Sequence, residues 1–518
     1  MNYSINYIKI YFWQFISIVL NFLSMFIVVP YLTSNSNIYG IYTVCISIST
    51  FLVYADLGFV SAGQKYASEY FAKGNRIEEM RVIGFTNFIL IVFLLLLSAT
   101  ILYLSIFPEM LIKKMANTNE LNIASRLLFI LAIFTPVTML QRLSQMVFAI
   151  RLEDFIVQRT NIIANLIKIV SVLYFFRNNN YDIIGYFLFT QLLNLTAILI
   201  TFSIAKTRFS YDIKTLLMSI RFNNVIFNKT KGLAFTSLFS LFTWILYYEL
   251  DPAVIGKWLG AKEVAIFAIG LTIMSFFRSI LGSIFGPFSV RFNHFIGLKD
   301  TEGLKTLCKS ISTITAPLVI IPIVALILLS NALILSWVGS DYAASVLPAR
   351  FLIACNGFAF LTYPCSLLLM AQERIKIMYI VNAALPIIYW IGIGCTFSYI
   401  GVNAFGLFKF VAFFINAFFC LIILKRYFQM SFLQVIQNYF LPVILPIVFL
   451  IVSFYFLSSH LPLEKSKMNL FRVGGYAFIM IGGAFGVLYF TSNLFKSQFK
   501  KIIIATSNDK KNDIMLSL

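Results

Sequence analysis

Long apolar stretches, separated by short polar segments, follow one another along almost the whole chain. They recur from Ile8 onwards, and each is about twenty residues long, enough to cross roughly 30 Å of hydrocarbon as a helix. The pattern therefore predicts an all-α integral membrane protein with about fourteen transmembrane helices. The expected spans are 8–32, 38–60, 83–106, 122–150, 156–176, 181–205, 232–259, 263–289, 308–338, 344–371, 376–398, 402–424, 434–458 and 470–495.

The first apolar stretch is longer than the core of a signal peptide. No small-residue cleavage site follows it before the second stretch, so we interpret 8–32 as a retained helix.

The distribution of lysine and arginine among the polar segments predicts the orientation. With the N-terminus placed in the cytoplasm, 26 of the 40 basic residues fall in inside segments and nine in outside segments. Cytoplasmic loops are enriched in lysine and arginine, so we expect both termini in the cytoplasm and an even number of spans. The net charge of +20 is dispersed in this way and forms no patch, so no nucleic-acid partner is expected.

Two pairs of similar segments indicate an internal repeat. VVPYLTSNSNIYGIYTV (28–44) parallels VIGKWLGAKEVAIFAIG (254–270), and VFAIRLEDF (147–155) parallels LLMAQERIKI (368–377). Both halves begin on the same side of the membrane, which makes them parallel repeats. We expect a six-helix N-terminal lobe at 1–205, a basic cytoplasmic linker at 206–231, a six-helix C-terminal lobe at 232–426, and two additional helices with a cytoplasmic tail at 427–518.

Several charged residues lie inside the expected spans, where a charge at a helix centre costs about 2.5–3.5 kcal/mol. The cations are Arg142, Lys168, Arg278, Arg350 and Lys409, and the acids are Asp56, Glu249 and Asp251. If all of them faced one cavity, five cations and three acids would give it a net charge of +2. Such a cavity would attract an anion, for example a pyrophosphate or an acidic sugar.

Arg142 and Arg278 are the strongest candidate ligands, because each lies deep in its helix and the two belong to different lobes. Two alternatives remain open for the five cations: a side chain extends to a lipid headgroup, or it pairs with an internal acid.

Glu249 and Asp251 stand just before Pro252, which removes a backbone hydrogen bond from the expected seventh span. Acids beside a helix break are suited to binding a coupling proton or sodium ion, and Asp56, in the sequence ADLGF, could serve the same purpose. The alternatives are that Glu249 and Asp251 neutralise the cavity cations or face the periplasm, and that Asp56 belongs to a turn at a helix end.

No metal ion and no cofactor are expected. His294 and His460 are far apart, and the six cysteines lie in or beside apolar spans without the spacing of a metal or redox site.

Three segments carry a family resemblance. They read NIYGIYTVCISISTFLVYADLGF (37–59), ELDPAVIGKWLGAKEVAIFAIG (249–270) and ILSWVGSDYAASVLPARFLI (334–353). Together they resemble the multidrug/oligosaccharidyl-lipid/polysaccharide exporter superfamily, and within it the Wzx-type O-antigen and polysaccharide flippases, over residues 1–425. The chain departs from the family pattern at Pro252, where a basic residue usually follows the aspartate, and at Phe267, where tyrosine is usual.

The resemblance implies an alternating-access carrier with two helical bundles in a V. Its cargo would be an undecaprenyl-pyrophosphate-linked oligosaccharide repeat unit, moved across the bacterial inner membrane for O-antigen, lipopolysaccharide or capsule biosynthesis. The implied partners are membrane lipids, a coupling proton or sodium ion in antiport, and other polysaccharide assembly proteins.

Three other functions are alternatives. A peptidoglycan-precursor flippase would share the anionic cargo, whereas the excess of cations argues against a cation-coupled multidrug exporter. A membrane polysaccharide polymerase or glycosyltransferase is disfavoured, because the outside segments are short and no nucleotide-binding or nucleophile motif occurs. The sequence therefore indicates a transporter and not an enzyme.

Overall fold

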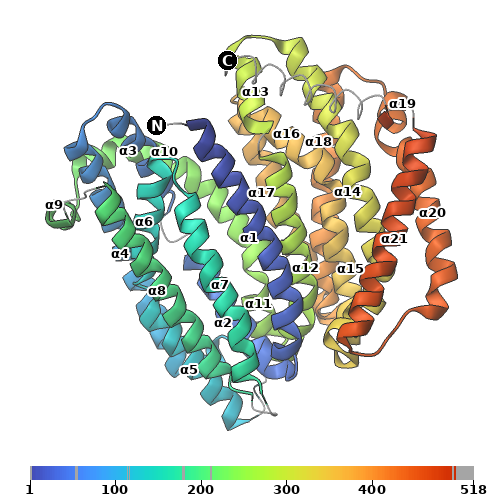
Figure 1. Ribbon diagram of the computed structural model, residues 1–518, viewed down its shortest axis with the longest axis horizontal. Coiled ribbons are helices and arrows are strands. Elements are labelled where there is room, and N and C mark those ends of the chain that lie inside the picture. The colour runs from blue at the N-terminus through green and yellow to red at the C-terminus, as the bar shows by residue number, and fades with distance from the viewer. Residues whose placement is uncertain are drawn as a thin grey trace. The chain divides into compact units, whose positions relative to one another are not determined.

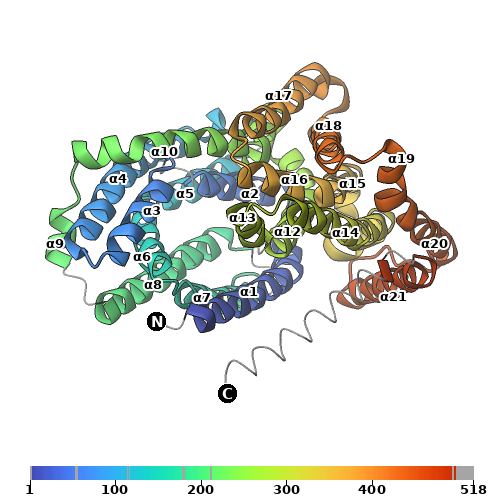
Figure 2. The same cartoon turned by 90° about the horizontal axis from the view of Figure 1, so that it is seen from above.

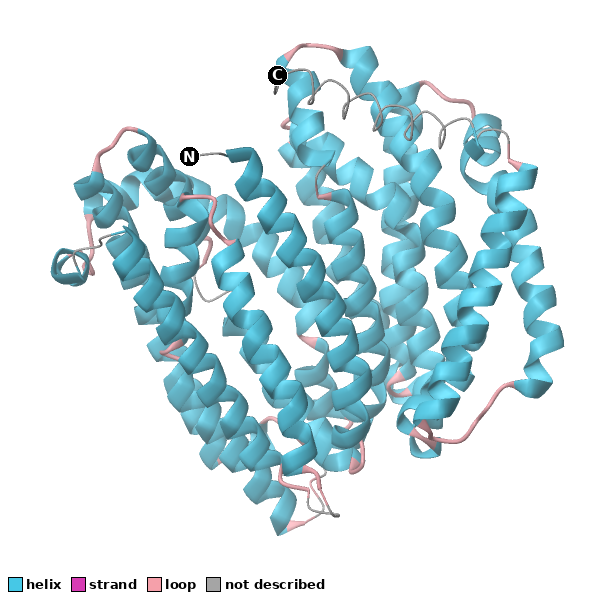
Figure 3. Cartoon of the chain, in the orientation of Figure 1, coloured by secondary structure: helices cyan, strands magenta, loops and turns pink. Residues whose placement is uncertain are grey.

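The structure is a computed structural model of the chain, and it describes residues 3–52, 57–113, 115, 117–177, 181–209, 213–286, 288–492 and 495–496. Within these ranges the secondary structure is helical and contains no strand (Figure 3). Eleven helices are long and apolar enough to cross a membrane, or thirteen if each of two bent pairs forms one span. The predicted all-α membrane fold is confirmed.

The expected span 38–60 is not among the spans found. Its first part is α2 (Ser36–Phe51), its last part belongs to α3 (Phe59–Ala72), and residues 53–56 between them lie outside the described ranges. A fourteenth span therefore stays a prediction.

The α-helices are labelled in Figure 1. Those of the first half of the chain are α1 (Tyr3–Leu32), α2, α3, α4 (Arg76–Ile106), α5 (Thr118–Phe134), α6 (Thr138–Ile150), α7 (Phe155–Phe175), α8 (Ile183–Phe209), α9 (Ile213–Met218), α10 (Asn224–Trp244) and α11 (Asp251–Trp258). The others are α12 (Ala261–Phe285), α13 (Phe288–Gly297), α14 (Thr301–Val338), α15 (Val346–Cys355), α16 (Ala359–Ala371), α17 (Ile375–Ile400), α18 (Asn403–Phe428), α19 (Phe432–Val435), α20 (Leu441–Leu457) and α21 (Lys467–Thr491).

Large apolar side chains are exposed on the outer helices. Val170 and Tyr174 on α7 are 66% and 78% exposed, and Phe478 and Phe490 on α21 are 80% and 83% exposed. Apolar exposure of this extent is unfavourable in water and is expected where helices face lipid. Together with the number of spanning helices, it identifies a multi-pass membrane protein.

The contacts between helices divide the chain into two compact units, Met1–Ala268 and Ile269–Leu518. Residues 206–231, expected as a linker, comprise the end of α8, the short α9 and the start of α10, and these helices pack within the first unit against α4 and α3. The division between the units falls inside α12. The expected lobe boundaries and the V arrangement stay predictions, since each unit is described by itself.

The internal repeat is visible in the backbone. The turn from α6 to α7 and the turn from α16 to α17 are the paired segments 147–155 and 368–377. Leu152 and Glu373 occupy the same place in these turns, with left-handed φ values of 54° and 55°. The amide of the next residue donates to the carbonyl oxygen five residues earlier, at 3.0 Å in the first turn and 2.9 Å in the second. A left-handed non-glycine residue is uncommon, so its recurrence at equivalent places supports a repeated unit.

A second pair of turns repeats in the same way, between α3 and α4 and between α13 and α14. Gly74 and Lys299 are left-handed, with φ values of 71° and 56°. The next residue then caps the following helix: Asn75 Oδ1 accepts an amide hydrogen bond at 3.2 Å, and Asp300 Oδ1 accepts one at 2.8 Å. Glycine and lysine share no side-chain chemistry, so the sequence pattern alone did not identify this pair.

The segments 28–44 and 254–270 are in contact through Gly40 and Ala261, which both belong to the first unit. A Cβ atom added to Gly40 on α2 would lie 1.8 Å from the carbonyl oxygen of Ala261, at the start of α12. Only glycine permits this close approach of the two helices.

The last two helices pack on α14, as Figure 2 shows. Their common core contains Ile321 and Leu329 from α14, Leu450 from α20, and Met480 and Leu488 from α21, all at most 1% exposed. The loop between α20 and α21 is tied to the end of α14, since Ser466 N donates to Ser336 O at 3.2 Å. The two C-terminal helices are thus part of the second unit.

Candidate functional site

Arg142 lies one turn beyond a break between α5 and α6. The two helices form a bent pair with an angle of 45°, and Pro136 stands at the break. Thr135 Oγ1 donates to Leu131 O and Thr138 Oγ1 donates to Thr135 O, each at 2.7 Å, so hydroxyl groups satisfy carbonyl groups near the break. The Arg142 side chain is half-buried and has a long hydrogen bond of 3.4 Å to Gln145 Oε1. The first unit therefore combines a cation with polar groups at an interrupted span.

Glu249 and Asp251 lie at a second break, as their position before Pro252 predicted. The chain passes from α10 through a π-helical turn (Ile245–Glu249) into α11, with a bend of 49°. Asp251 is fully buried at the start of α11, whereas Glu249 is half-buried and accepts a hydrogen bond from Trp244 Nε1 at 3.2 Å. The two carboxylates thus have different surroundings, and the buried Asp251 is the better placed of the two to exclude water from a bound ion.

Arg278 lies on α12 in the second unit, and its side chain is half-buried. Two contacts with the α15–α16 segment position this helix. Asn356 Nδ2 donates to Met274 O at 3.2 Å, and the Tyr363 hydroxyl donates to the carbonyl of Arg278 itself at 3.5 Å. The Tyr363 ring is also stacked on Phe285, with centroids 4.8 Å apart.

The other two candidate cations of the second unit, Arg350 and Lys409, take part in helix packing. Arg350 Nε on α15 donates to Ser330 Oγ on α14 at 2.9 Å. Lys409 on α18 is 0% exposed, and its Nζ lies 5.0 Å from the centroid of the Tyr389 ring on α17, a cation–π contact. These contacts join α15 to α14 and α18 to α17.

Lys168 on α7, in the first unit, is half-buried. Asp56 lies outside the described residues. The first unit thus holds Arg142, Lys168, Glu249 and Asp251, and the second holds Arg278, Arg350 and Lys409. A single cavity shared by these charges stays a prediction, and so do their roles in binding and coupling.

A buried ion pair in the first unit was not identified from the sequence. Arg151 Nη2 lies 2.7 Å from Glu79 Oε1, and the two side chains are 2% and 1% exposed. Arg151 Nη1 also donates to Val147 O at 3.1 Å, and the guanidinium carbon lies 4.5 Å and 4.7 Å from the centroids of Phe71 and Phe209. The pair therefore joins α4, the α6–α7 turn, α3 and α8.

Neighbouring groups extend this connection. Arg208 Nε at the end of α8 lies 2.7 Å from Glu153 Oε2 in the α6–α7 turn, and Arg76 Nη1 lies 3.6 Å from Glu79 Oε2. Next to Glu153, burial raises the pKa of Asp154 to about 6. The charges at this end of the unit hold the ends of four helices together.

Metal binding finds no support in the described part of the chain. No group of three or more histidine, cysteine, aspartate or glutamate residues is placed there so that it could hold a metal ion.

Comparison with known proteins identifies the fold. No family model and no curated protein matches the sequence. Among solved structures, the chain is similar to the lipid II flippase MurJ in an inward closed conformation, with a TM-score of 0.69 and 14% identity over 94% of this chain and 99% of that chain. It is also similar to an inward-facing multidrug resistance MATE family transporter of the MOP superfamily, with a TM-score of 0.63 and 11% identity over 80% of this chain and 94% of that chain.

A MOP superfamily transporter from Pyrococcus furiosus is more distant, with a TM-score of 0.50 and 13% identity over 80% of this chain and 95% of that chain. At these identities the likeness establishes a fold shared with MurJ and the MATE transporters.

Proposed function

We propose that this protein is a flippase that carries an undecaprenyl-pyrophosphate-linked oligosaccharide repeat unit across the bacterial inner membrane. The observation that carries the proposal is the likeness of almost the whole chain to the lipid II flippase MurJ, with 94% of this chain and 99% of that chain covered. The resemblance of three sequence segments to Wzx-type flippases supports a repeat unit for O-antigen or capsule as the cargo. The distribution of basic residues supports an orientation with both termini in the cytoplasm.

The extent of the match favours a flippase over a drug exporter. Two of the MATE structures cover 80% and 83% of this chain. The match to MurJ covers 94% of this chain. The half-buried Arg142 and Arg278 also suit an anionic cargo better than a cationic drug.

A peptidoglycan-precursor flippase is the second candidate. The specific observation in its favour is that the MurJ structure with the TM-score of 0.69 is described as a lipid II flippase.

Cells that lack this protein are expected to accumulate undecaprenyl-linked repeat units in the cytoplasmic leaflet. The measurement is the accessibility of these intermediates to a membrane-impermeant sugar oxidant, in intact spheroplasts and in opened membranes. Units that are already accessible from outside, but not polymerised, would reassign the protein as a polymerase. Accumulation of lipid II in place of the repeat unit would support the second candidate, a peptidoglycan-precursor flippase.

Transport is expected to depend on an ion gradient through Asp251. In vesicles that contain the purified protein, a proton or sodium gradient should speed flipping by the wild type and have no effect on Asp251→Asn, because the amide cannot exchange a proton or neutralise a cation. Glu249→Gln serves as the matched variant, since that carboxylate is less buried and is engaged by Trp244. Flipping by the wild type that ignores both gradients contradicts the coupling role.

A further inference from the structure

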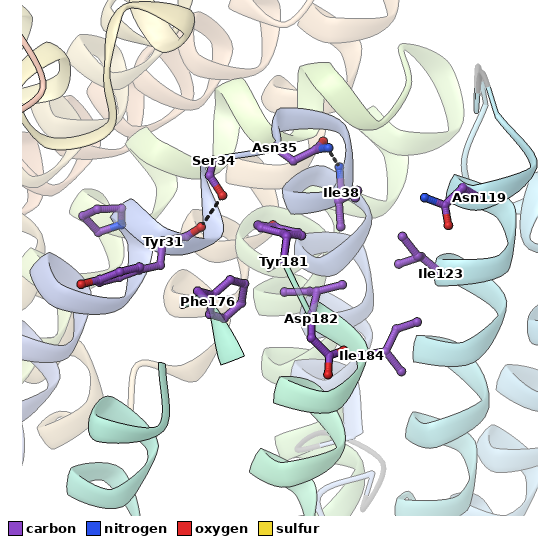
Figure 4. A pocket seen from close by; sticks show the side chains of 12 residues that line it. Tyr31, Ser34, Asn35, Ile38, Asn119, Ile123, Phe176, Tyr181, Asp182 and Ile184 are labelled. Carbon is purple, nitrogen blue, oxygen red and sulfur yellow. Dashed lines mark hydrogen bonds between the residues drawn. The ribbon is translucent and has the colours of Figure 1, made fainter. Parts of the chain in front are cut away.

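A cavity lies at the end of the first unit where α1 ends and α8 begins. Its volume is about 640 Å³, and Figure 4 shows side chains from α1, the α1–α2 turn, the start of α5 and the α7–α8 segment around it. In the proposed orientation this is the periplasmic end of the helices, because α1 runs outwards from a cytoplasmic N-terminus. None of the charged residues considered for transport is among the residues that line this cavity.

Aromatic rings form one side of the cavity. Tyr31, Phe176 and Tyr181 lie together in the view of Figure 4. Phe176 and Tyr181 meet edge to face, with centroids 5.1 Å apart, and the Tyr181 hydroxyl donates to Leu32 O at 2.6 Å, which fixes the ring. Burial raises the pKa of Tyr181, so its hydroxyl stays protonated and uncharged. The rings offer flat apolar faces with polar edges.

Short polar side chains complete the lining. Asn119 lies opposite the rings in Figure 4, and Asn35 and Asp182 lie at the starts of α2 and α8. Asn35 Oδ1 accepts the Ile38 amide at 3.1 Å, and Asp182 Oδ1 accepts the Gly185 amide at 2.8 Å. Two helix starts therefore hold these side chains in place, and the amide nitrogen of Asn35 is a further donor.

We propose that this cavity binds uncharged sugar residues of the cargo on the periplasmic side, an inference that rests on the proposed function. A pyranose ring has an apolar C–H face, which suits the aromatic rings, and hydroxyl groups at its edge, which suit amide and carboxylate groups. The volume lies within the usual range of about 300–1,000 Å³ for ligand sites.

The charge of the lining selects the uncharged part of the cargo. The twelve described lining residues include the carboxylate of Asp182 and no lysine or arginine. A pyrophosphate would find no cation there and would be repelled by Asp182, whereas sugar hydroxyls donate to a carboxylate. The lining thus suits the saccharide part of the cargo and not its phosphates.

The test is protection of a cysteine placed in the cavity. Asn119→Cys is introduced together with Cys395→Ser, because Cys395 is exposed and the other five cysteines are buried. The intact chain in vesicles is labelled with an impermeant maleimide, with and without the oligosaccharide that mild acid releases from the host's lipid-linked repeat units. At about ten times the dissociation constant, occupancy slows labelling about tenfold. Inorganic pyrophosphate at the same concentration is expected to leave the rate unchanged.

Two matched variants make the result specific. Asn122→Cys, exposed on the same helix and outside the lining, should be labelled at the same rate with and without oligosaccharide. Tyr31→Ala should weaken protection of Asn119→Cys, and Tyr174→Ala, at a tyrosine 78% exposed on α7, should not.

Several results would overturn the inference: no protection, equal protection at both cysteines, or protection by pyrophosphate. The leaflet assay in deletion cells separates its failure from that of the proposed function. If repeat units accumulate inside those cells and the cysteine is not protected, the saccharide site alone is refuted; if they appear outside, the proposed function fails as well.

Discussion

Replacing Arg151 by methionine is expected to lower the free energy of unfolding by about 3 kcal/mol, because the buried Glu79 carboxylate loses the closer of its two arginine contacts and keeps Arg76 at 3.6 Å. Glu79 is 1% exposed, so water cannot take the place of the guanidinium. The change also removes the contacts of Arg151 with Phe71 and Phe209.

Thermal unfolding of the purified protein in detergent measures the loss of stability, and Arg81→Met is the control. Arg81 forms an ion pair with Glu78, and the two side chains are 53% and 30% exposed. The loss of this exposed pair should cost less than about 1 kcal/mol.

A double variant distinguishes the ion pair from packing at this site. The repeated turns place Leu304, which is fully buried, at the position in the second half that Glu79 occupies in the first. An apolar residue is therefore tolerated at this place in the fold. Glu79→Leu combined with Arg151→Met should recover a large part of the loss, because no charge is left buried. A double variant as unstable as Arg151→Met would show that packing by the arginine, and not the loss of the ion pair with Glu79, accounts for the effect.

Much of the fold followed from the sequence because membrane spans are encoded locally. Each span is a continuous apolar stretch, and a break such as that at Pro252 is marked by the residue that causes it. The paired turns around Leu152 and Glu373 were found because each is a short interruption between two apolar stretches and the two are 221 positions apart. The equivalent turns at Gly74 and Lys299 were not predicted, because the two turns share a backbone conformation but differ in their residues.

The candidate site was less accessible to sequence reasoning, because side-chain partners depend on distant contacts. Glu79 and Arg151 are 72 positions apart, and Arg151 was counted only among the basic residues of the inside segments. The burial of Glu79 at the first turn of an apolar helix gave no local signal of its partner. The contact of Lys409 with Tyr389 depends likewise on the packing of α17 against α18, which no periodicity in either helix specifies.

Replacing Arg278 by alanine is expected to reduce flipping by roughly 10- to 150-fold, and Arg142→Ala by a similar factor. A hydrogen bond to a charged group contributes about 1.5–3 kcal/mol, and each 1.4 kcal/mol changes a rate or an affinity tenfold. Lysine in place of Arg278 should retain part of the activity, because it keeps the charge and loses the two-pronged geometry that fits a phosphate. The measurement is the flipping rate of a fluorescent lipid-linked oligosaccharide in vesicles with equal amounts of protein.

The control for this series is Arg291→Ala, at an exposed arginine on α13 in the same unit as Arg278. It removes the same charge from the protein without removing a half-buried guanidinium, so it should flip at the wild-type rate. Tyr363 donates to the backbone carbonyl of Arg278 and not to its side chain, so truncation of the side chain leaves this link between helices in place. A loss of activity in Arg278→Ala therefore reports on the guanidinium. Wild-type rates in both Arg142→Ala and Arg278→Ala would remove these residues as ligands, and Lys168→Ala would be the next variant to measure.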